Sequence, residues 1–237
     1  MKRLALLTFA LFVACVPDTS RAPITVEVHA QGVARTTETI GDYVVTLLDA
    51  RVVVGPLYFC SAAHASDELC RTARLELLEP FGVDLLDPSA QLGGVAEGTT
   101  GRVSSAQFDL GRSFLKTRSA PAPTSDALDG HSAIFVFEVE GPERTFTVDV
   151  EIDLDPARAG ASLVMGARTT ADVTHATESV TLRFDPWALV ASIDFALLEA
   201  RAELVDPLEL GPGDQAYESI AVRLTEGHVP TFAWSSR

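Results

Sequence analysis

Apolar and polar residues alternate with a period of two along much of the chain. The segment ITVEVHA, residues 24 to 30, places Ile24, Val26 and Val28 at every second position, with polar side chains between them. Successive side chains of a strand point to opposite faces, so this alternation predicts a β-strand with one buried face and one solvated face.

Further segments share this period or are dense in β-branched and aromatic residues, which favour strands. They cover residues 43–59, 73–79, 81–87, 102–110, 134–141, 145–154 and 180–185. Gly55-Pro56 interrupts the first of them, which is therefore one bent strand or two strands. The four residues from Gly141 to Arg144 predict a hairpin between residues 134–141 and 145–154.

Two segments without this pattern are expected to be loops. GGVAEGTTG, residues 93–101, is rich in glycine and predicts a turn or a flexible loop. Residues 117–131, TRSAPAPTSDALDGH, form the longest stretch rich in Pro, Ala, Ser and Asp. We interpret them as a long surface loop, with a boundary between two halves of the chain as the alternative.

A helical pattern is clear near the C-terminus. In residues 214 to 225, Asp214 can cap the first turn, and Ala216, Ile220 and Leu224 share one stripe. The apolar segment from Trp187 to Leu198 is open to a helical interpretation. The patterns together predict a mainly β protein, an antiparallel β-sandwich with one C-terminal helix, as a single domain over residues 24–237.

The N-terminus has the layout of a signal peptide. Lys2 and Arg3 precede an uncharged, mostly apolar run that ends at Ala14. This run is shorter than the roughly 20 apolar residues that a membrane-spanning helix needs. We therefore expect residues 1–14 to be a signal peptide and the protein to be exported.

The end of this run, Phe12-Val13-Ala14-Cys15, resembles the lipobox of bacterial lipoproteins. The resemblance implies that Cys15 becomes the first mature residue and carries a lipid, with residues 15–23 as a flexible tether. The expected location is then the cell envelope, lipid-anchored at the outer membrane or on the periplasmic face. An ordinary signal peptide cut nearby is the alternative.

The stretch YFCSAAHASDELC, residues 58–70, holds the other two cysteines of the chain, Cys60 and Cys70. Disulfides persist in exported proteins, and this spacing fits neither a CxxC pair nor a Cys/His quartet. We therefore predict a Cys60–Cys70 disulfide that presents His64 in a short loop. Metal ligation by His64 is the minority alternative. Pairing these two also leaves Cys15 as the odd cysteine, which lipidation would use.

The charge balance disfavours two classes of partner. Removal of residues 1–14 takes two of the 18 basic side chains and none of the 33 acidic ones, leaving a formal charge of about −17. Nucleic acid and anionic membrane surfaces are therefore poor partners for the chain as a whole. The partners that remain are the membrane, through the N-terminal lipid, and an unidentified envelope protein.

The sequence contains none of the common catalytic motifs, such as G-x-S-x-G, H-E-x-x-H or a Walker loop. We therefore expect no enzymatic activity. Asp149, Glu151, Asp153 and Asp155 recur at every second position, which indicates one acidic strand face. A solvated face is favoured over a calcium site, because the EF-hand spacing is not met.

Histidines are the remaining candidate ligands. His29 lies on the polar face of the first strand, His64 in the Cys60–Cys70 loop, and His131 at the entry to a central strand. Neutral imidazole is a common ligand of transition metals, so these three could converge on copper or zinc.

Several segments in order resemble the copper-binding periplasmic proteins of methanobactin operons. They are DYVVTLLDARVVVGPLYF, FGVDLLDPSAQLGG, GTTGRVSSAQFDLGRSF, DGHSAIFVFEVEG and SVTLRFDPWALVASIDF. The resemblance implies a secreted β-sandwich that binds copper through histidine, and by position it points to His29 and His131. The sequence as a whole leaves two expected functions. One is a non-enzymatic binding or structural module of the envelope, and the other is a copper-binding protein that uses His29, His64 and His131.

Overall fold

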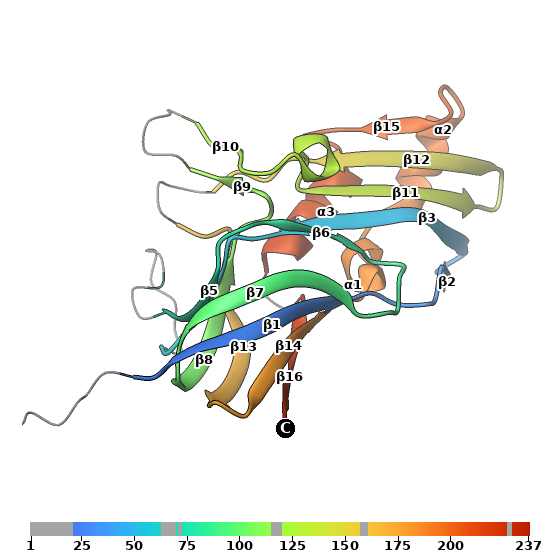
Figure 1. The fold of residues 1–237 in the computed structure, drawn as a ribbon. Coiled ribbons are helices and arrows are strands. Elements are labelled where there is room, and N and C mark those ends of the chain that lie inside the picture. The colour runs from blue at the N-terminus through green and yellow to red at the C-terminus, as the bar shows by residue number, and fades with distance from the viewer. Residues whose placement is uncertain (1–20, 63–69, 71–72, 115–119, 157–160, 227–228) are drawn as a thin grey trace, which may run out of the picture.

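The computed structural model describes residues 21–62, 70, 73–114, 120–156, 161–226 and 229–237. Most of the described chain lies in two β-sheets that form the layers of a sandwich (Figure 1). The prediction of a mainly β sandwich is therefore confirmed. Cys15, His64 and the proposed signal peptide lie outside the described residues.

The larger sheet has eight strands, and most of its neighbouring pairs are antiparallel. Its order is β13 (Val164–Val173), β8 (Gly101–Phe108), β4 (Leu57–Cys60), β5 (Ala73–Leu77), β7 (Gln91–Thr99), β1 (Pro23–Gln31), β14 (Thr177–Arg183) and β16 (Thr231–Ser236). Strands β1 and β14 pair in parallel, with Glu27 opposite Ser179. This parallel pair departs from the antiparallel expectation. Parallel strands need a long crossover connection, and the chain between Gln31 and Thr177 provides one.

The smaller sheet has six strands built around the long strand β3. Its order is β15 (Leu208–Leu210), β12 (Thr145–Ile152), β11 (Ala133–Glu140), β3 (Tyr43–Val54) and β2 (Thr37–Ile40), and β6 (Phe81–Asp84) also pairs with β3. The predicted hairpin is confirmed, since β11 and β12 are antiparallel and Gly141 donates its N–H to the Arg144 carbonyl at 2.9 Å. Strands β12 and β15 form a second parallel pair.

The segment predicted as one bent strand or two proves to be two strands in different sheets. β3 ends at Val54 in the six-stranded sheet, and β4 begins at Leu57 in the eight-stranded sheet. The chain therefore crosses from one layer to the other at Gly55-Pro56, the break that the sequence indicates.

The prediction of a loop over residues 93–101 is wrong, because residues 91–99 form β7 in the middle of a sheet. Its glycines make room for close neighbours rather than for a turn. A Cβ atom at Gly93 would lie 2.5 Å from the Phe81 ring, and one at Gly98 would lie 1.8 Å from the Arg74 carbonyl oxygen. Glycine in a strand thus marks the close approach of other atoms here.

The interruption near residues 117–131 contains short elements in its described part. These are β10 (Ala122–Pro123), which pairs with β9 (Arg112–Ser113), and the 3-10 helix η1 (Ala127–Gly130). The domain boundaries stay a prediction.

Three α-helices lie in the C-terminal part of the described chain. They are α1 (Pro186–Val190), α2 (Phe195–Ala202) and α3 (Gln215–Thr225), of which α3 is the predicted helix. Trp187, Phe195 and Ile220 from these helices are buried members of the same core as the inward side chains of both sheets. The helices thus fill part of the sandwich. None of the described helices is long and apolar enough to cross a membrane.

Candidate functional site

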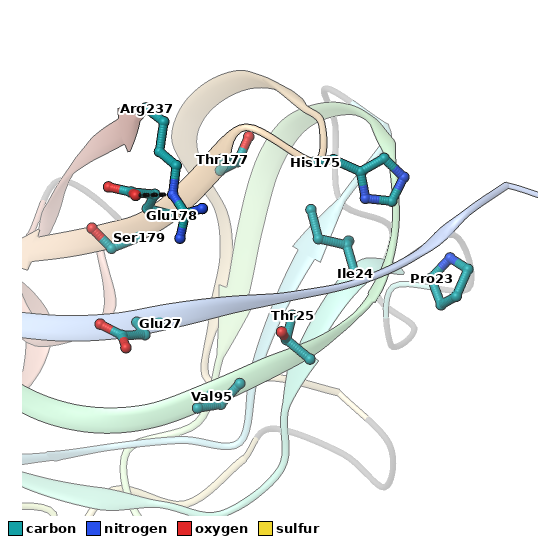
Figure 2. A pocket seen from close by; sticks show the side chains of 10 residues that line it. All are labelled: Pro23, Ile24, Thr25, Glu27, Val95, His175, Thr177, Glu178, Ser179 and Arg237. Carbon is teal, nitrogen blue, oxygen red and sulfur yellow. Dashed lines mark hydrogen bonds and ion pairs between the residues drawn. The ribbon is translucent and has the colours of Figure 1, made fainter.

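An open groove of about 650 Å³ lies where β1 and β14 run side by side (Figure 2). The residues that line it come from β1, β7, the start of β14 with the turn before it, and the C-terminal residue. They are Pro23, Ile24, Thr25, Glu27, Val95, His175, Thr177, Glu178, Ser179 and Arg237. Its lining of hydroxyl groups, carboxylates, one imidazole and one guanidinium group can hydrogen-bond a polar ligand.

The C-terminal residue is held at the edge of this groove by its backbone and its side chain. The Arg237 N–H donates to the Ala176 carbonyl at 3.0 Å, and the Arg237 guanidinium group pairs with the Glu178 carboxylate. The Arg237 side chain is nevertheless 83% exposed. Because the pair is exposed, both groups are accessible to a ligand. Exposed ion pairs of this kind also stabilise a fold little.

His29 lies on β1 beside this groove and bonds to a groove residue. Its Nε2 atom is 3.1 Å from the Glu27 carboxylate, and its Nδ1 atom is buried without a hydrogen-bond partner among the described residues. The sequence prediction of a histidine on the polar face of this strand agrees with this position, because Val26, Val28 and Ala30 point into the core.

His131 lies just before β11 of the other sheet, within a network of charged side chains. Its Nδ1 atom is 3.1 Å from the Asp153 carboxylate, and its Nε2 atom is 3.4 Å from the Glu151 carboxylate. Arg112 continues the network, 3.3 Å from Asp153 and 3.2 Å from Asp155. Arg112 could not be predicted from the sequence, because 41 positions separate it from Asp153 and no local pattern links them.

A second groove, of about 480 Å³, borders this network and is lined by His131, Asp149, Glu151, Asp153, Glu209, Leu210 and Gly211. Asp149 and Glu209 are register partners in the parallel pair of β12 and β15. Glu151, Asp153 and Asp155 are exposed, as the alternation along this segment predicts, although β12 itself ends at Ile152. The arrangement is an acidic, solvated face in which Arg112 neutralises part of the charge.

The described histidines do not assemble into the copper site that the resemblance implies. His29 lies on β1 of the eight-stranded sheet, whereas His131 lies just before β11 of the six-stranded sheet. Both ring nitrogens of His131 already lie beside carboxylate oxygens. Within the described ranges, no group of three or more His, Cys, Asp or Glu side chains could hold a metal ion. Copper binding through His29, His64 and His131 stays a prediction.

Cys60 and Cys70 form the predicted disulfide, with their Cα atoms 5.9 Å apart. Cys60 is the last residue of β4 and is 3% exposed. The bond joins the end of a central strand to the loop that follows it. His64 falls in the part of this loop outside the described residues.

A buried carboxylate that the sequence analysis missed lies just beyond β8. Asp109 is 5% exposed and accepts a hydrogen bond from the Leu163 N–H at 3.0 Å. Burial raises the pKa of Asp109 to about 7, and the Leu163 hydrogen bond offsets only part of this effect. A buried residue of this kind has no sequence signal, because Asp109 alternates with Phe108 and Leu110 like any solvated strand residue.

Comparison with known proteins gives little beyond this geometry. No protein-family model and no curated protein matches the chain. Among solved structures, MbnP from Methylosinus trichosporium is similar at a TM-score of 0.33 and 14% identity, over 74% of this chain and 79% of that chain. A likeness at this level carries no argument about function.

Proposed function

We propose that this chain is an exported, lipid-anchored protein of the bacterial cell envelope that acts as a non-enzymatic binding or structural module. The observation that carries the proposal is the pairing of Cys60 with Cys70. Of the three cysteines in the chain, this pairing leaves Cys15, which directly follows the apolar run of the expected signal peptide.

Two independent requirements of an exported lipoprotein meet in this arrangement. A disulfide between Cys60 and Cys70 suits an oxidising compartment outside the cytoplasm. An unpaired thiol exposed in that compartment would be reactive, and acylation of Cys15 removes it. The disulfide and the lipobox-like segment therefore support the same location, although they lie in different parts of the chain.

The groove at the start of β1 supports a binding role near the membrane. Only eight positions separate Cys15 from Pro23. A fully extended chain of that length spans at most about 28 Å, so the groove would stay close to the bilayer. Its open form and its mixed lining of hydroxyl and charged groups suit the reversible binding of a polar ligand or of an envelope protein.

The test is to express the full chain in bacteria with an alkyne-labelled fatty acid and to separate membranes from soluble fractions. We expect the wild type to be labelled and to sediment with membranes, and Cys15→Ser to be unlabelled and soluble. Cys60→Ala/Cys70→Ala is the matched control, because it removes two cysteines and keeps the lipidation site. An unlabelled wild type, or membrane retention of Cys15→Ser, would show that the anchor is wrong.

A further inference from the structure

Three polar side chains are buried on the outer face of β8 and just beyond its end, where solvated residues are expected. They are Ser105, Gln107 and Asp109, which are 1%, 1% and 5% exposed. Ala106 and Phe108, which alternate with them, belong to the hydrophobic core. Because successive side chains of an extended chain point to opposite faces, the three polar side chains point away from that core.

Two segments of the chain reach these side chains from outside the sheet. The Ser105 hydroxyl donates to the carbonyl of Ala62, which follows β4, at 2.6 Å. The Asp109 carboxylate accepts a hydrogen bond from the N–H of Leu163, which precedes β13, at 3.0 Å. Polar groups shielded from bulk water in this way need partners inside the protein.

Several oxygen atoms in this buried layer lack a sufficient partner. The Oε1 atom of Gln107 and the Oγ atom of Ser162 are buried without a hydrogen-bond partner among the described residues. Asp109 has the Leu163 hydrogen bond, which offsets only part of the cost of burying its charge, and no described basic side chain adds to it. Buried charges in proteins are usually paired or coordinate a metal ion.

The backbone brings these oxygen-bearing side chains together. Gln107 and Asp109 are two positions apart on one face, so their Cβ atoms are about 6.6 Å apart. Ser162 directly precedes Leu163, whose N–H contacts Asp109, so the Ser162 Cα atom lies within about 5 Å of that carboxylate. Tyr58 is the register partner of Gln107, and burial, together with the nearby Asp109 charge, raises the pKa of Tyr58. We name these four residues the Asp109 cluster: Tyr58, Gln107, Asp109 and Ser162.

Strand β13, which runs beside β8 in Figure 1, is irregular next to this cluster. Met165 and Gly166 both lie opposite Gln107, so one residue of β13 is extra. Gly166 has a φ of 71°, in the left-handed region that favours glycine. A bulge of this kind leaves its extra residue out of the backbone ladder, which frees backbone groups beside Gln107.

We propose that the Asp109 cluster binds a calcium ion, with the Asp109 carboxylate, the Gln107 Oε1 atom and the Ser162 Oγ atom as its side-chain ligands. Calcium takes roughly six to eight oxygen ligands at about 2.3–2.6 Å in a flexible geometry, so carboxylate, amide, hydroxyl and backbone oxygens all suit it. The cluster contains neither the thiolates nor the imidazoles that transition metals prefer. A cation also offsets the buried Asp109 charge, which a buried water molecule does not. This inference is independent of the proposed lipid anchor.

The experiment is equilibrium dialysis of the purified full chain against radioactive calcium, after removal of metal with EDTA and with magnesium in the buffer. It is done at pH 8, above the Asp109 pKa of about 7. We expect about one calcium ion per wild-type chain. Asp109→Asn keeps the size of the side chain but removes its charge, so it should bind calcium at least about tenfold more weakly. Gln107→Met and Ser162→Ala each remove one neutral ligand and should weaken binding less.

Asp153→Asn is the matched control, because it removes an exposed carboxylate from the acidic face of the other sheet. It should bind calcium as the wild type does. In thermal melts, calcium should raise the Tm of the wild type and of Asp153→Asn but not that of Asp109→Asn. If Asp109→Asn does not fold, Gln107→Met serves for the same comparison. A wild type without bound calcium, unchanged binding in the cluster variants, or loss of binding in Asp153→Asn would overturn the proposal.

Discussion

The indole N–H of Trp234 donates to the Thr169 hydroxyl at 2.8 Å, and this bond joins β16 to β13. These are the two edge strands of the eight-stranded sheet, and no backbone ladder connects them. The Phe59 ring packs edge-on against Trp234 from inside, at 5.0 Å between centroids. The sheet therefore curls until its edges meet, and side chains bridge the seam.

Replacing the indole with a ring that cannot donate should weaken this seam. Trp234→Phe leaves the buried Thr169 hydroxyl unpaired, and we expect the free energy of unfolding to fall by about 1 kcal/mol. Urea denaturation followed by circular dichroism measures this loss. Trp234→Phe/Thr169→Val should cost less than the sum of the two single variants, since neither partner is then left unpaired. Strict additivity would show that the bond does not stabilise the fold.

Glu199 on α2 holds the β11–β12 hairpin in place. Its carboxylate accepts hydrogen bonds from the N–H groups of Glu143 and Arg144, at 2.9 and 3.1 Å, and from the Tyr43 hydroxyl at 3.2 Å. Burial by itself would raise the pKa of Glu199, but these hydrogen bonds outweigh it and lower the pKa below its usual value.

Glu199→Gln should therefore be less stable than the wild type at neutral pH. The ionised carboxylate stabilises the fold above its ordinary pKa, and this contribution is lost as the pH falls through the lowered pKa of the folded state. The difference between wild type and Glu199→Gln should shrink accordingly in thermal melts below pH 4.5. Glu203→Gln, an exposed neighbour, is the control and should change stability little at any pH. A pH-independent difference for Glu199→Gln would contradict this account.

Asp109 should make the wild type less stable as the pH rises. Its pKa of about 7 in the folded state lies above the ordinary value of 3.8, so the folded protein retains the proton more strongly than the unfolded chain. Stability is then fully present below pH 3.8 and is lost progressively up to about pH 7. We expect Asp109→Asn to flatten this decline and to gain relative to the wild type at pH 8. Parallel pH profiles for the two proteins in urea melts would disprove the raised pKa.

Removing the Cys60–Cys70 disulfide should destabilise the domain. Closing a loop of this length stabilises a fold by roughly 2–3 kcal/mol, and Cys60→Ala/Cys70→Ala loses this contribution. Chemical denaturation of the wild type with and without a reducing agent gives an independent value. Cys15→Ser should denature like the wild type. Reaction of both Cys60 and Cys70 with a thiol reagent in the folded, unreduced protein would contradict the pairing.

We expect the folded wild-type protein to retain less than one equivalent of copper per chain. His29 lies on β1 of the eight-stranded sheet, and His131 lies just before β11 of the six-stranded sheet. Glu27 already pairs with the Nε2 atom of His29, and Glu151 and Asp153 lie beside the two ring nitrogens of His131. Mass spectrometry of metal content after loading with copper and dialysis measures this directly, with zinc and calcium as comparisons. His29→Ala and His131→Ala should retain no less than the wild type. Near one equivalent of copper, lost in either variant, would restore the copper-binding function.

The sequence by itself determined the elements whose signal is local. Alternation over residues 24–30, 134–141 and 145–154 predicts β1, β11 and β12, because side chains two positions apart share one face of a strand. The apolar stripe of Ala216, Ile220 and Leu224 predicts α3, because side chains four positions apart share one face of a helix. Cysteine number and the exported context predict the Cys60–Cys70 bond.

The tertiary structure alone decided what depends on neighbours far along the chain. Gly93 and Gly98 are required within β7, because the Phe81 ring and the Arg74 backbone occupy the space that larger side chains would need. Asp109 became a buried group, and Arg112 met Asp153, through contacts over 40 or more positions. Local periodicity indicates which face of a strand or helix a side chain lies on. It does not indicate which distant segment packs against that face, because this depends on packing across the whole core.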